Sequence, residues 1–266
     1  MKIGIFDSGL GGLVIAKAIF KKLPRYDYVY LGDTKRVPYG NRAADEVYRF
    51  TKNAVQYLFE QNCQLIILAC NTASALALRK IQQQFLPRFY PDRRVLGVVI
   101  PTLEIFPRGS SSRGIGVLAT SATIKSHIYK KELIKINARA KIYEQAAPKL
   151  VPMIEENKMA DVEPVLRQYL TPLTKHQISA IILGCTHYPI LKTKISQIAG
   201  KHVKIVSQTD IIPLKLGDYL QRHKEIANRL SKKHQRSFFV TKYNRQFGQV
   251  AKRLFGKKLK FKVAGV

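Results

Sequence analysis

Residues 65–74, LIILACNTAS, join an unbroken apolar run to a cysteine, an amide and two hydroxyl side chains, and residues 180–189, AIILGCTHYP, repeat the arrangement. Short apolar runs without alternation are typical of strands that are buried on both faces of a parallel sheet. Small and hydroxyl residues after such a run are typical of the start of a helix. Each stretch therefore predicts a buried strand that leads through a cysteine into a helix.

The same alternation of short β-branched runs with longer amphipathic segments continues along the chain. The runs expected to be strands are 2–6, 28–32, 65–69, 95–100, 114–119, 140–144, 180–184 and 203–207. The segments expected to be helices are 11–22, 43–60, 72–85, 101–107, 121–136, 151–157, 159–172, a helix from about 188, and 210–223 on both sides of Pro213. Strands that alternate with helices predict an α/β fold with parallel sheets.

Two halves of the chain carry matching motifs. Residues 3–12 and 66–74 in the first half resemble residues 115–123 and 181–189 in the second, since each is a strand followed by small and hydroxyl residues. We therefore expect two similar α/β domains, each a mainly parallel sheet flanked by helices. Because ligands of open parallel sheets bind beyond the carboxyl ends of the strands, the active site is expected in the cleft between the domains.

The expected boundaries lie near residues 97 and 207. The first domain then consists of residues 1–96, which carry Asp7, Ser8 and Cys70, and is completed by the C-terminal segment 208–266. The second domain consists of residues 97–207, which carry Thr120, Cys185 and His187.

Composition favours a globular protein of the cytoplasm. The chain has 266 residues, of which 46% are hydrophobic. Its apolar runs are far shorter than the roughly 18 residues that a membrane helix needs, and Asp7 interrupts the N-terminus before a signal-peptide core could form. The three cysteines are an odd number in a chain without an export signal, so we expect reduced thiols and not a disulfide framework.

The formal net charge of +29 raises nucleic-acid binding as an alternative function. Residues 222–266 hold fourteen Lys and Arg residues against one acid, Glu225. The segment has no zinc-finger spacing, RRM-type aromatic motif or basic heptad helix. We therefore expect nucleic-acid binding to be at most weak and secondary.

Cys70 and Cys185 are candidate catalytic residues, whereas Cys63 is expected to precede its strand as a small core or surface residue. Each of the two candidates lies where a strand meets a helix start, where the helix dipole lowers a thiol pKa. Together with His187 they have no C-x-x-C pair and provide too few ligands for a structural zinc site, so no metal is expected. A cysteine–histidine nucleophile would need only one thiol and would leave the second cysteine unexplained.

A pair of thiols on opposite faces of one Cα explains both cysteines, because racemisation needs one group that removes a proton and another that returns one. The hydroxyl-rich helix starts favour a small anionic ligand. The stretch DSGLGG, residues 7–12, lacks the features of a nucleotide-binding loop and is otherwise an ordinary tight turn.

Six motifs together resemble the glutamate racemases of the aspartate/glutamate racemase family. They are residues 3–13, 30–40, 69–75, 115–129, 147–155 and 184–189, and the resemblance extends to FFVT at 238–241. It implies an isomerase without a cofactor that makes D-glutamate for peptidoglycan, and thus for cell-wall biogenesis and cell shape. Racemases of aspartate also use two thiols and are the alternative. The motifs CNT, CTHYP and PYG favour glutamate. We also expect a homodimer.

By this resemblance Cys70 deprotonates D-glutamate and Cys185 deprotonates L-glutamate, while Asp7 assists the first thiol and His187 the second. Glu155 would lie near His187 as a second-layer residue. The residues implied to bind substrate are Asp7, Ser8, Tyr39, Gly40, Asn71, Thr72, Thr120, Thr123, Thr186 and His187.

Other interpretations exist for some of these residues. Asp7 and Ser8 are also suited to cap the helix that begins near residue 11, and His187 to be a buried histidine with satisfied hydrogen bonds. The chain departs from the family pattern at Val206 and Lys242, where acidic residues are usual. Both positions lie outside the cysteine motifs, so we expect them to affect packing and not the chemistry.

Overall fold

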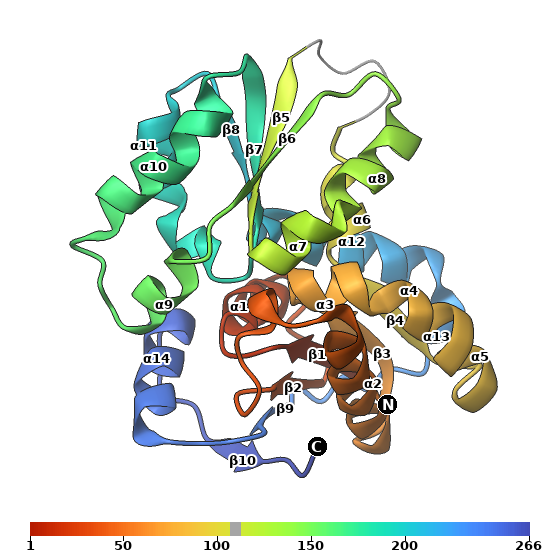
Figure 1. Ribbon diagram of the computed structural model, residues 1–266. Coiled ribbons are helices and arrows are strands. Elements are labelled where there is room, and N and C mark those ends of the chain that lie inside the picture. The colour runs from red at the N-terminus through yellow and green to blue at the C-terminus, as the bar shows by residue number, and fades with distance from the viewer. Residues whose placement is uncertain (107–112) are drawn as a thin grey trace.

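The computed structural model describes residues 1–106 and 113–266, which form two parallel sheets (Figure 1). Every strand pair in both sheets is parallel. The first sheet has six strands, in the order β10 (Phe261–Val263), β9 (Arg236–Val240), β2 (Tyr28–Gly32), β1 (Lys2–Asp7), β3 (Cys63–Leu68) and β4 (Arg94–Gly97). The second has four, in the order β6 (Ile142–Ala146), β5 (Gly114–Ala119), β7 (Ile178–Gly184) and β8 (Lys204–Val206).

Helices cover both faces of the first sheet. One face packs against α1 (Gly12–Lys22), which in turn contacts α12 (Gln208–Arg222) and α14 (Arg245–Phe255). The other face packs against α2 (Ala44–Glu60) and α3 (Asn71–Leu76). The short helices α4 (Leu78–Lys80), α5 (Leu86–Phe89) and α13 (Lys224–Ala227) lie at its margin, and the short helical segment Tyr39–Asn41 precedes α2.

The second sheet is covered in the same way. On one side lie α10 (Val162–Thr174) and α11 (Lys192–Ala199), and on the other lie α7 (Ser121–Ser126), α8 (Ile128–Ile136) and α6 (Val99–Leu103) (Figure 1). Helix α9 (Leu150–Glu155) and the short segment Tyr188–Leu191 follow β6 and β7. The predicted α/β class with two helix-flanked parallel sheets is confirmed.

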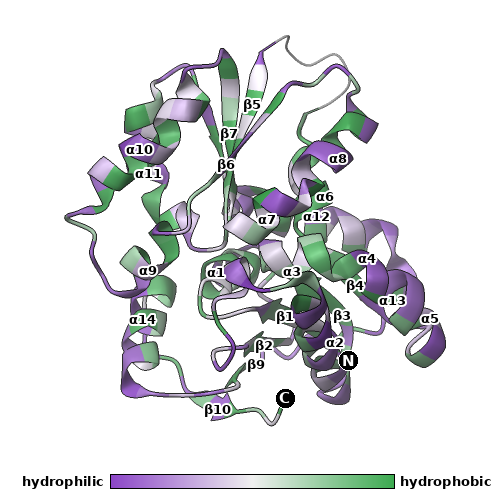
Figure 2. Cartoon of the chain, in the orientation of Figure 1, coloured by the Kyte–Doolittle hydropathy of each residue, from purple (hydrophilic) through white to green (hydrophobic). Residues whose placement is uncertain are grey.

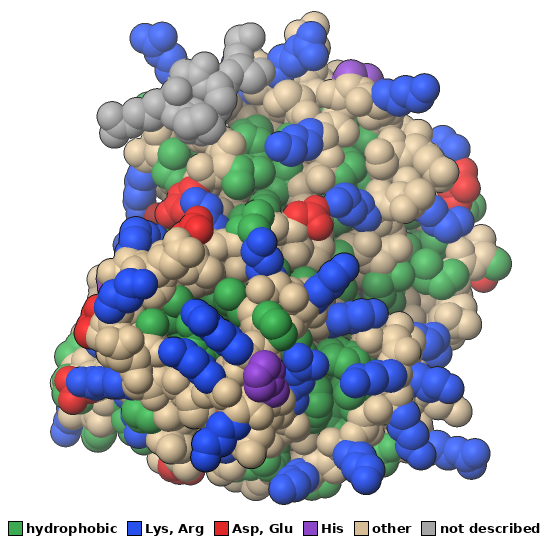
Figure 3. Space-filling view, turned by 180° about the vertical axis from the view of Figure 1, so that it is seen from behind, with side chains coloured by type: hydrophobic (Ala, Val, Ile, Leu, Met, Phe, Trp, Pro, Cys, Tyr) green, Lys and Arg blue, Asp and Glu red, His purple; other side chains and the backbone are tan. Residues whose placement is uncertain are grey.

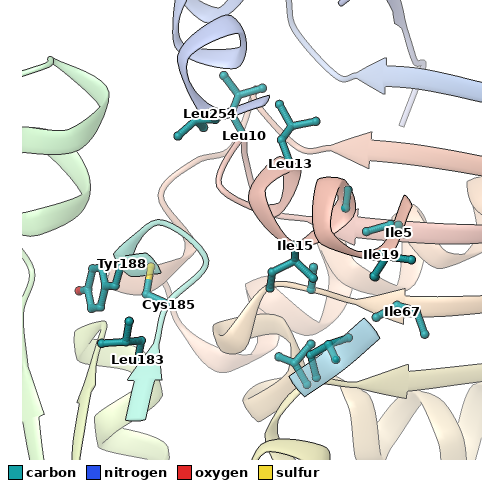
Figure 4. Close-up of a cluster of buried hydrophobic side chains, with 14 of the residues drawn as sticks. Ile5, Leu10, Leu13, Ile15, Ile19, Ile67, Leu183, Cys185, Tyr188 and Leu254 are labelled. Carbon is teal, nitrogen blue, oxygen red and sulfur yellow. The ribbon is translucent and has the colours of Figure 1, made fainter. Parts of the chain in front are cut away.

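One buried cluster of hydrophobic side chains connects the two sheets. It includes Ile5 and Ile67 from the first sheet, Ile15 from α1, and Leu183 and Cys185 from the second half (Figure 4). In Figure 2, hydrophobic residues are frequent in strands such as β7, whereas outer helices such as α2 and α5 carry hydrophilic residues. The thiol of Cys185 is thus anchored in a core that both halves share.

Some predicted elements differ from the observed ones. The apolar run 95–100 was expected to be one strand, but β4 ends at Gly97 and α6 begins at Val99. Pairing of β4 with β3 ends at Gly97, and the hydroxyl of Thr102 in α6 donates a hydrogen bond to the carbonyl of Val98. A short apolar run does not by itself separate strand from helix.

Two predicted helices are interrupted. The segment 72–85 forms α3, α4 and a π-helical turn at Ile81–Phe85. The segment 121–136 is divided at His127, whose φ of 52° is left-handed, into α7 and α8. By contrast, α12 continues through Pro213.

Further positions differ by a few residues. Cys63 was placed before its strand and is instead the buried first residue of β3. The end of the predicted helix at 107 lies outside the described residues. The domain division into 1–96 with 208–266, and 97–207, stays a prediction.

The surface is basic over both halves. Figure 3 shows Lys and Arg side chains spread across the upper and lower parts of the molecule, with few Asp and Glu side chains among them. None of the helices in the described ranges 1–106 and 113–266 has the length and apolar character to cross a membrane.

The shared core predicts a large effect of Ile5→Ala, because Ile5 is fully buried on the central strand β1. We expect this change to lower the free energy of unfolding by about 2–5 kcal/mol. Urea unfolding followed by circular dichroism measures it, with the exposed Lys22→Ala on α1 as the control. A loss of less than about 0.5 kcal/mol, the usual range for surface changes, would contradict this assignment of the core.

Candidate active site

The carboxyl ends of four central strands meet between the two sheets. Asp7 is the last residue of β1, and Cys70 follows β3. Thr120 and Cys185 follow β5 and β7 in the second sheet. These ends enclose a cavity of about 60 Å³ that includes both thiols in its lining. The cavity is small compared with the roughly 300–1,000 Å³ of pockets for drug-sized ligands, so it suits a small molecule.

Most of the predicted site residues lie together at this cavity. Those that line it are Ser8, Tyr39, Gly40, Cys70, Asn71, Thr72, Thr120, Cys185, Thr186 and His187. Asp7, Thr123 and Glu155 do not line it but each forms a hydrogen bond with a residue that does. The structure thus brings all the predicted site residues into one region.

Cys70 is the N-cap residue of α3. Its Sγ accepts a hydrogen bond from the backbone N–H of Ala73 at 3.5 Å and donates to Oγ of Ser8 at 3.3 Å. Burial and the nearby charge of Asp7 raise the pKa of this thiol to about 12, against the smaller lowering effects of Ser8 and Ala73. The expectation that the helix start lowers the pKa of Cys70 is therefore wrong, because loss of solvation outweighs the helix N–H group.

Cys185 is paired with a buried histidine. Its Sγ lies 3.9 Å from Nδ1 of His187, and Nε2 of that ring lies 3.0 Å from Oε1 of Glu155 at the end of α9. Burial alone would lower the pKa of His187, but the hydrogen bonds and charges of Cys185 and Glu155 raise it to about 10. These two partners favour the protonated form of the imidazole, which lies between a sulfur and a carboxylate.

Asp7 is at the end of a strand of the first sheet, and its carboxylate contacts Thr186 after a strand of the second sheet. Its exposed fraction is only 1%. Its Oδ1 accepts a hydrogen bond from Oγ1 of Thr186 at 3.2 Å, and its Oδ2 accepts one from the N–H of Gly9 at 3.0 Å. Burial raises the pKa of Asp7 above its usual value, although the charge of His187 and these hydrogen bonds act in the opposite direction. A carboxyl in this setting is better suited to carry a proton than an exposed one.

Three threonine hydroxyls form a triangle, and two of these residues, Thr72 and Thr120, line the cavity. Oγ1 of Thr72 lies 3.0 Å from Oγ1 of Thr120 and 3.1 Å from Oγ1 of Thr123, and the last two are 3.0 Å apart. Thr72 belongs to α3, whereas the other two belong to the start of α7. Each hydroxyl can donate one hydrogen bond and accept others, so the group can bind either a carboxylate or an ammonium.

The loop with Tyr39 and Gly40 is anchored by Asp33, which the sequence analysis did not single out. The buried Asp33 carboxylate accepts hydrogen bonds from the Tyr39 hydroxyl at 2.6 Å and from Oγ1 of Thr241 at 2.7 Å. Arg36 forms an ion pair with the same carboxylate at 3.1 Å. In the sequence, only the separation of six positions between Asp33 and Tyr39, within the motif at residues 30–40, indicated that these two side chains are in contact.

Gly11 was also missed, although its lack of a side chain determines the geometry around His187. A Cβ at Gly11 would lie 2.4 Å from Nδ1 of His187 and 2.5 Å from Oγ1 of Thr186. The start of α1 therefore packs directly on the second cysteine motif. Apolar wall residues that were not predicted are Val37, Pro38, Pro148, Val151 and Pro152.

The two residues that depart from the family pattern lie in different surroundings. Val206 is 2% exposed and lies in a hydrophobic cluster of the second sheet. Lys242 has an exposed side chain, and its backbone N–H donates to Oγ1 of Thr34 at 3.0 Å. Within residues 1–106 and 113–266, no group of three or more His, Cys, Asp or Glu side chains is arranged to hold a metal ion.

A second cavity, of about 280 Å³, lies between α3, α4, α6, α8 and α12. Its lining contains none of the predicted site residues and no cysteine. The smaller cavity is the candidate active site because it alone of the two contains the paired acid/base groups.

Comparisons with known proteins agree on one family. The family model described as Asp/Glu/Hydantoin racemase matches residues 14–212. Glutamate racemase from Dinoroseobacter shibae is 37% identical over 238 residues, which cover 85% of this chain and 86% of that protein. The crystal structure of glutamate racemase isoform RacE1 from Bacillus anthracis has a TM-score of 0.89 at 33% identity, covering 100% of this chain and 97% of that one. The structure from Francisella tularensis in complex with D-glutamate has a TM-score of 0.88 at 31% identity, covering 99% and 97%.

The His187 environment predicts that Glu155→Gln makes the imidazole lose its proton at a lower pH. In the folded protein the pKa of His187 is raised to about 10, partly by the hydrogen bond and charge of Glu155, so removal of that charge weakens the protonated form. Nitrogen-15 NMR of the His187 ring against pH measures the change. Glu156→Gln, at the exposed neighbour that pairs with Lys158, is the matched control and should leave the titration unchanged. An unchanged titration in Glu155→Gln would contradict the assigned environment.

Proposed function

Since this chain belongs to the Asp/Glu/hydantoin racemase family, we propose that it is a glutamate racemase that interconverts L-glutamate and D-glutamate by two-thiol proton transfer. One observation carries this proposal. Cys70 follows a strand of the first sheet, Cys185 follows a strand of the second, and both thiols line the same cavity. Two acid/base groups that approach from different halves can act on opposite faces of one carbon.

In the direction from L- to D-glutamate, the Cys185 thiolate removes the proton from Cα and the Cys70 thiol donates its proton to the opposite face. The carbanion exists only between these two transfers, and the charge that leaves Cys185 appears on Cys70. In the reverse direction Cys70 is the base and Cys185 the acid. The raised pKa of Cys70 supports its role as the proton donor in the first direction, because the thiol is neutral at neutral pH.

In the proposed mechanism Asp7 assists Cys70, and His187 assists Cys185. Protonated His187 donates toward Cys185 and is held by Glu155, which supports a role in returning the second thiol to its starting state. Asp7 lies near Cys70, whose pKa its charge raises, and is bonded to Thr186 of the other half. In the proposed mechanism both groups exchange protons with a thiol after each turnover.

Most of the groups proposed to hold the substrate are neutral hydroxyls and amides, together with the His187 imidazole. None of the described residues that line the cavity is a Lys or Arg, so the two carboxylates of glutamate bind to hydroxyls, amides and backbone N–H groups. Ser8, Thr72, Thr120, Thr123 and Thr186 supply the hydroxyls. Asn71, Tyr39 and Gly40 complete the proposed binding residues together with Asp7 and His187.

The proposed role of the product is to supply D-glutamate for peptidoglycan. Glutamate is favoured over aspartate because relatives that are 37% identical over most of the chain are named glutamate racemases. The cytoplasmic location, the homodimer and the secondary nature of any nucleic-acid binding stay predictions.

Incubation of the purified protein with each enantiomer of glutamate, followed by chiral chromatography, tests the proposal. We expect each enantiomer to be converted to the other without any added cofactor, because the two thiols supply both proton transfers. The same assay with aspartate is the control for substrate. No conversion of glutamate, or activity that depends on added pyridoxal phosphate, would contradict the proposal.

Replacing either thiol should remove racemisation but preserve one exchange reaction. Cys70→Ser and Cys185→Ser should each lower the racemisation rate by about 10²–10⁴-fold, since a serine hydroxyl is a much weaker acid than a thiol and is not ionised to act as the base. In deuterated water, Cys70→Ser should still exchange the Cα proton of L-glutamate and Cys185→Ser that of D-glutamate, as followed by proton NMR. Cys63→Ser is the control, since Cys63 is buried in β3. Normal racemisation by Cys185→Ser would refute the two-thiol mechanism.

Gly11→Ala should lower activity in both directions, because its Cβ would displace His187 and Thr186. A misplacement of about 1 Å at reacting groups is worth about 10²-fold in rate. The measurement is kcat/KM for both enantiomers, together with the thermal unfolding midpoint. Gly217→Ala on α12 is the matched control, because the nearest atom to a Cβ there is 3.8 Å away. Activity of Gly11→Ala within about twofold of the wild type would show that this contact is not needed.

A further inference from the structure

The C-terminal segment of the chain carries positive charges without any compensating acid. Residues 242–266 contain eight Lys and Arg residues and no Asp or Glu. They form α14, β10 and the loops beside them, which lie near one another at the lower left of Figure 1. The charge of this segment is therefore not neutralised by its own sequence.

Six of these cations are both exposed and unpaired. Within residues 1–106 and 113–266, none of the six side chains forms an ion pair or a hydrogen bond with another residue. After the half-turn of Figure 3 this end of the molecule lies at the lower right, where Lys and Arg side chains are frequent. Like charges gathered on one segment repel one another, so a bound anionic surface would stabilise them. The six are Lys242, Arg245, Lys257, Lys258, Lys260 and Lys262.

The same end of the molecule exposes apolar side chains. Val263 is 66% exposed, the highest value among the large hydrophobic residues that the structure describes, and Tyr243 is 49% exposed. Phe261 is partly buried, and its ring centre lies 6.1 Å from that of Tyr243. Phe261 and Val263 are two positions apart in β10, so they point to the same face of the strand. These three side chains and the six cations are together called the basic edge.

Protection of a sheet edge explains only part of this pattern. β10 is the outermost strand of the first sheet, and lysines on such a strand oppose its pairing with other chains. Protection does not explain Val263, because an exposed apolar side chain on an edge strand favours the pairing that the lysines oppose. Basic and apolar side chains occur together on surfaces that bind a bilayer, where the first contact anionic headgroups and the second enter the interface.

We propose that the basic edge is a docking surface for an anionic phospholipid bilayer. The six cations attract the headgroups, while Tyr243 and Val263 enter the boundary between headgroups and acyl chains. Tyrosine suits this boundary because its ring is apolar and its hydroxyl is polar. The protein lies on the surface of the bilayer, because exposed side chains of an edge strand and a loop supply the contact.

A nucleic acid is the other polyanion that this charge could attract, but it fits the exposed side chains less well. Single strands are held by bases that stack on successive aromatic rings. The basic edge offers the exposed ring of Tyr243, whereas Phe261 is partly buried. An aliphatic side chain such as Val263 has no partner on a phosphate backbone, but it gains free energy when it leaves water for a bilayer. The bilayer therefore accounts for both the charged and the apolar side chains.

Val263→Trp tests the contact directly, because the chain contains no tryptophan and the new side chain is then the single reporter. The probe is vesicles of phosphatidylglycerol and phosphatidylcholine at about 0.15 M salt, where long-range attraction is screened. We expect the tryptophan emission to shift to the blue and to be quenched by brominated acyl chains. Vesicles of phosphatidylcholine alone should have no effect. Phe89→Trp is the matched control and should show no shift, since Phe89 is 56% exposed in α5, on the other side of the first sheet (Figure 1).

Changes of charge and of polarity separate the two parts of the surface. Pelleting with the same vesicles measures the partition coefficient of the wild-type protein and of each variant. Lys260→Gln/Lys262→Gln should lower it by about 10–30-fold, because each cation near an anionic leaflet contributes about fivefold. Tyr243→Gln/Val263→Thr keeps the net charge and should lower it by about 3–10-fold, because less apolar area leaves water.

Arg88→Gln/Arg94→Gln is the matched control for charge, because it removes two exposed cations at α5 and β4, the opposite edge of the sheet. It should change the partition coefficient by less than about twofold, since charges far from the contact are screened. An equal loss in this variant and in the lysine variant would show attraction by net charge alone and would overturn the inference. No binding of the wild-type protein to the anionic vesicles, or an unshifted emission of Val263→Trp, would also overturn it.

The same variants test the other occupants of the surface. Binding of a single-stranded RNA that is lost in Lys260→Gln/Lys262→Gln, together with vesicle binding that is unchanged in Tyr243→Gln/Val263→Thr, would assign the surface to nucleic acid. Conversion of an oligomer to a monomer by Tyr243→Gln/Val263→Thr, measured by sedimentation, would assign it to a second copy of the chain. Either result would overturn the inference.

Thermal unfolding identifies a variant that fails to fold, and Val263→Trp alone is sufficient in that case. Vesicle binding is measured without turnover, so its result does not depend on the proposed function. All of these variants should racemise glutamate at the wild-type rate, because none of the changed residues belongs to the candidate active site.

Discussion

Burial of two thiols at the ends of parallel strands from separate sheets is the constraint on which the site depends. A parallel strand directs its carboxyl end and the following helix start to the same edge as its neighbours. Cys70 and Cys185 each occupy such an end, and the shared hydrophobic core fixes how far apart the two ends lie. The small glycines and threonines at this boundary, such as Gly11 and Thr186, allow the halves to approach closely.

Burial also determines the electrostatics of the site, and its effect differs between the two thiols. Around Cys70 the nearby charge is Asp7, so burial and charge act together to favour the neutral thiol. Around Cys185 the neighbour is His187, whose pKa the hydrogen bonds and charges of Cys185 and Glu155 raise despite burial. The two thiols therefore differ, since Cys70 is suited to donate a proton and Cys185 lies beside the imidazole of His187. In the proposed mechanism this arrangement serves the direction from L- to D-glutamate. In the proposed mechanism, one turnover leaves the two thiols ready for the reverse reaction. Another turnover in the same direction requires the protons to be redistributed, and Asp7 and His187 are the proposed carriers.

Much of this arrangement was predictable from local patterns, because strands and helix starts are encoded by neighbouring residues. The apolar runs before Cys70 and Cys185 identified β3 and β7, and the motifs identified the residues that meet at the cavity. The contacts of Tyr129 and Gln208 with Asn71 were not predictable, since they join residues far apart in the chain and leave no local pattern. The direction of the Cys70 pKa was predicted wrongly, because the depth of burial depends on the packing of both halves and not on the helix start alone.

The central claim is that the two sulfurs act on opposite faces of a single carbon. A crystal structure of this protein with bound D-glutamate tests it most directly. The account predicts that Cα lies between the two sulfur atoms, each about 3–3.5 Å away, the separation expected for reacting atoms. A complex in which both sulfurs lie on the same face of Cα, or in which only one of them reaches it, would contradict the account.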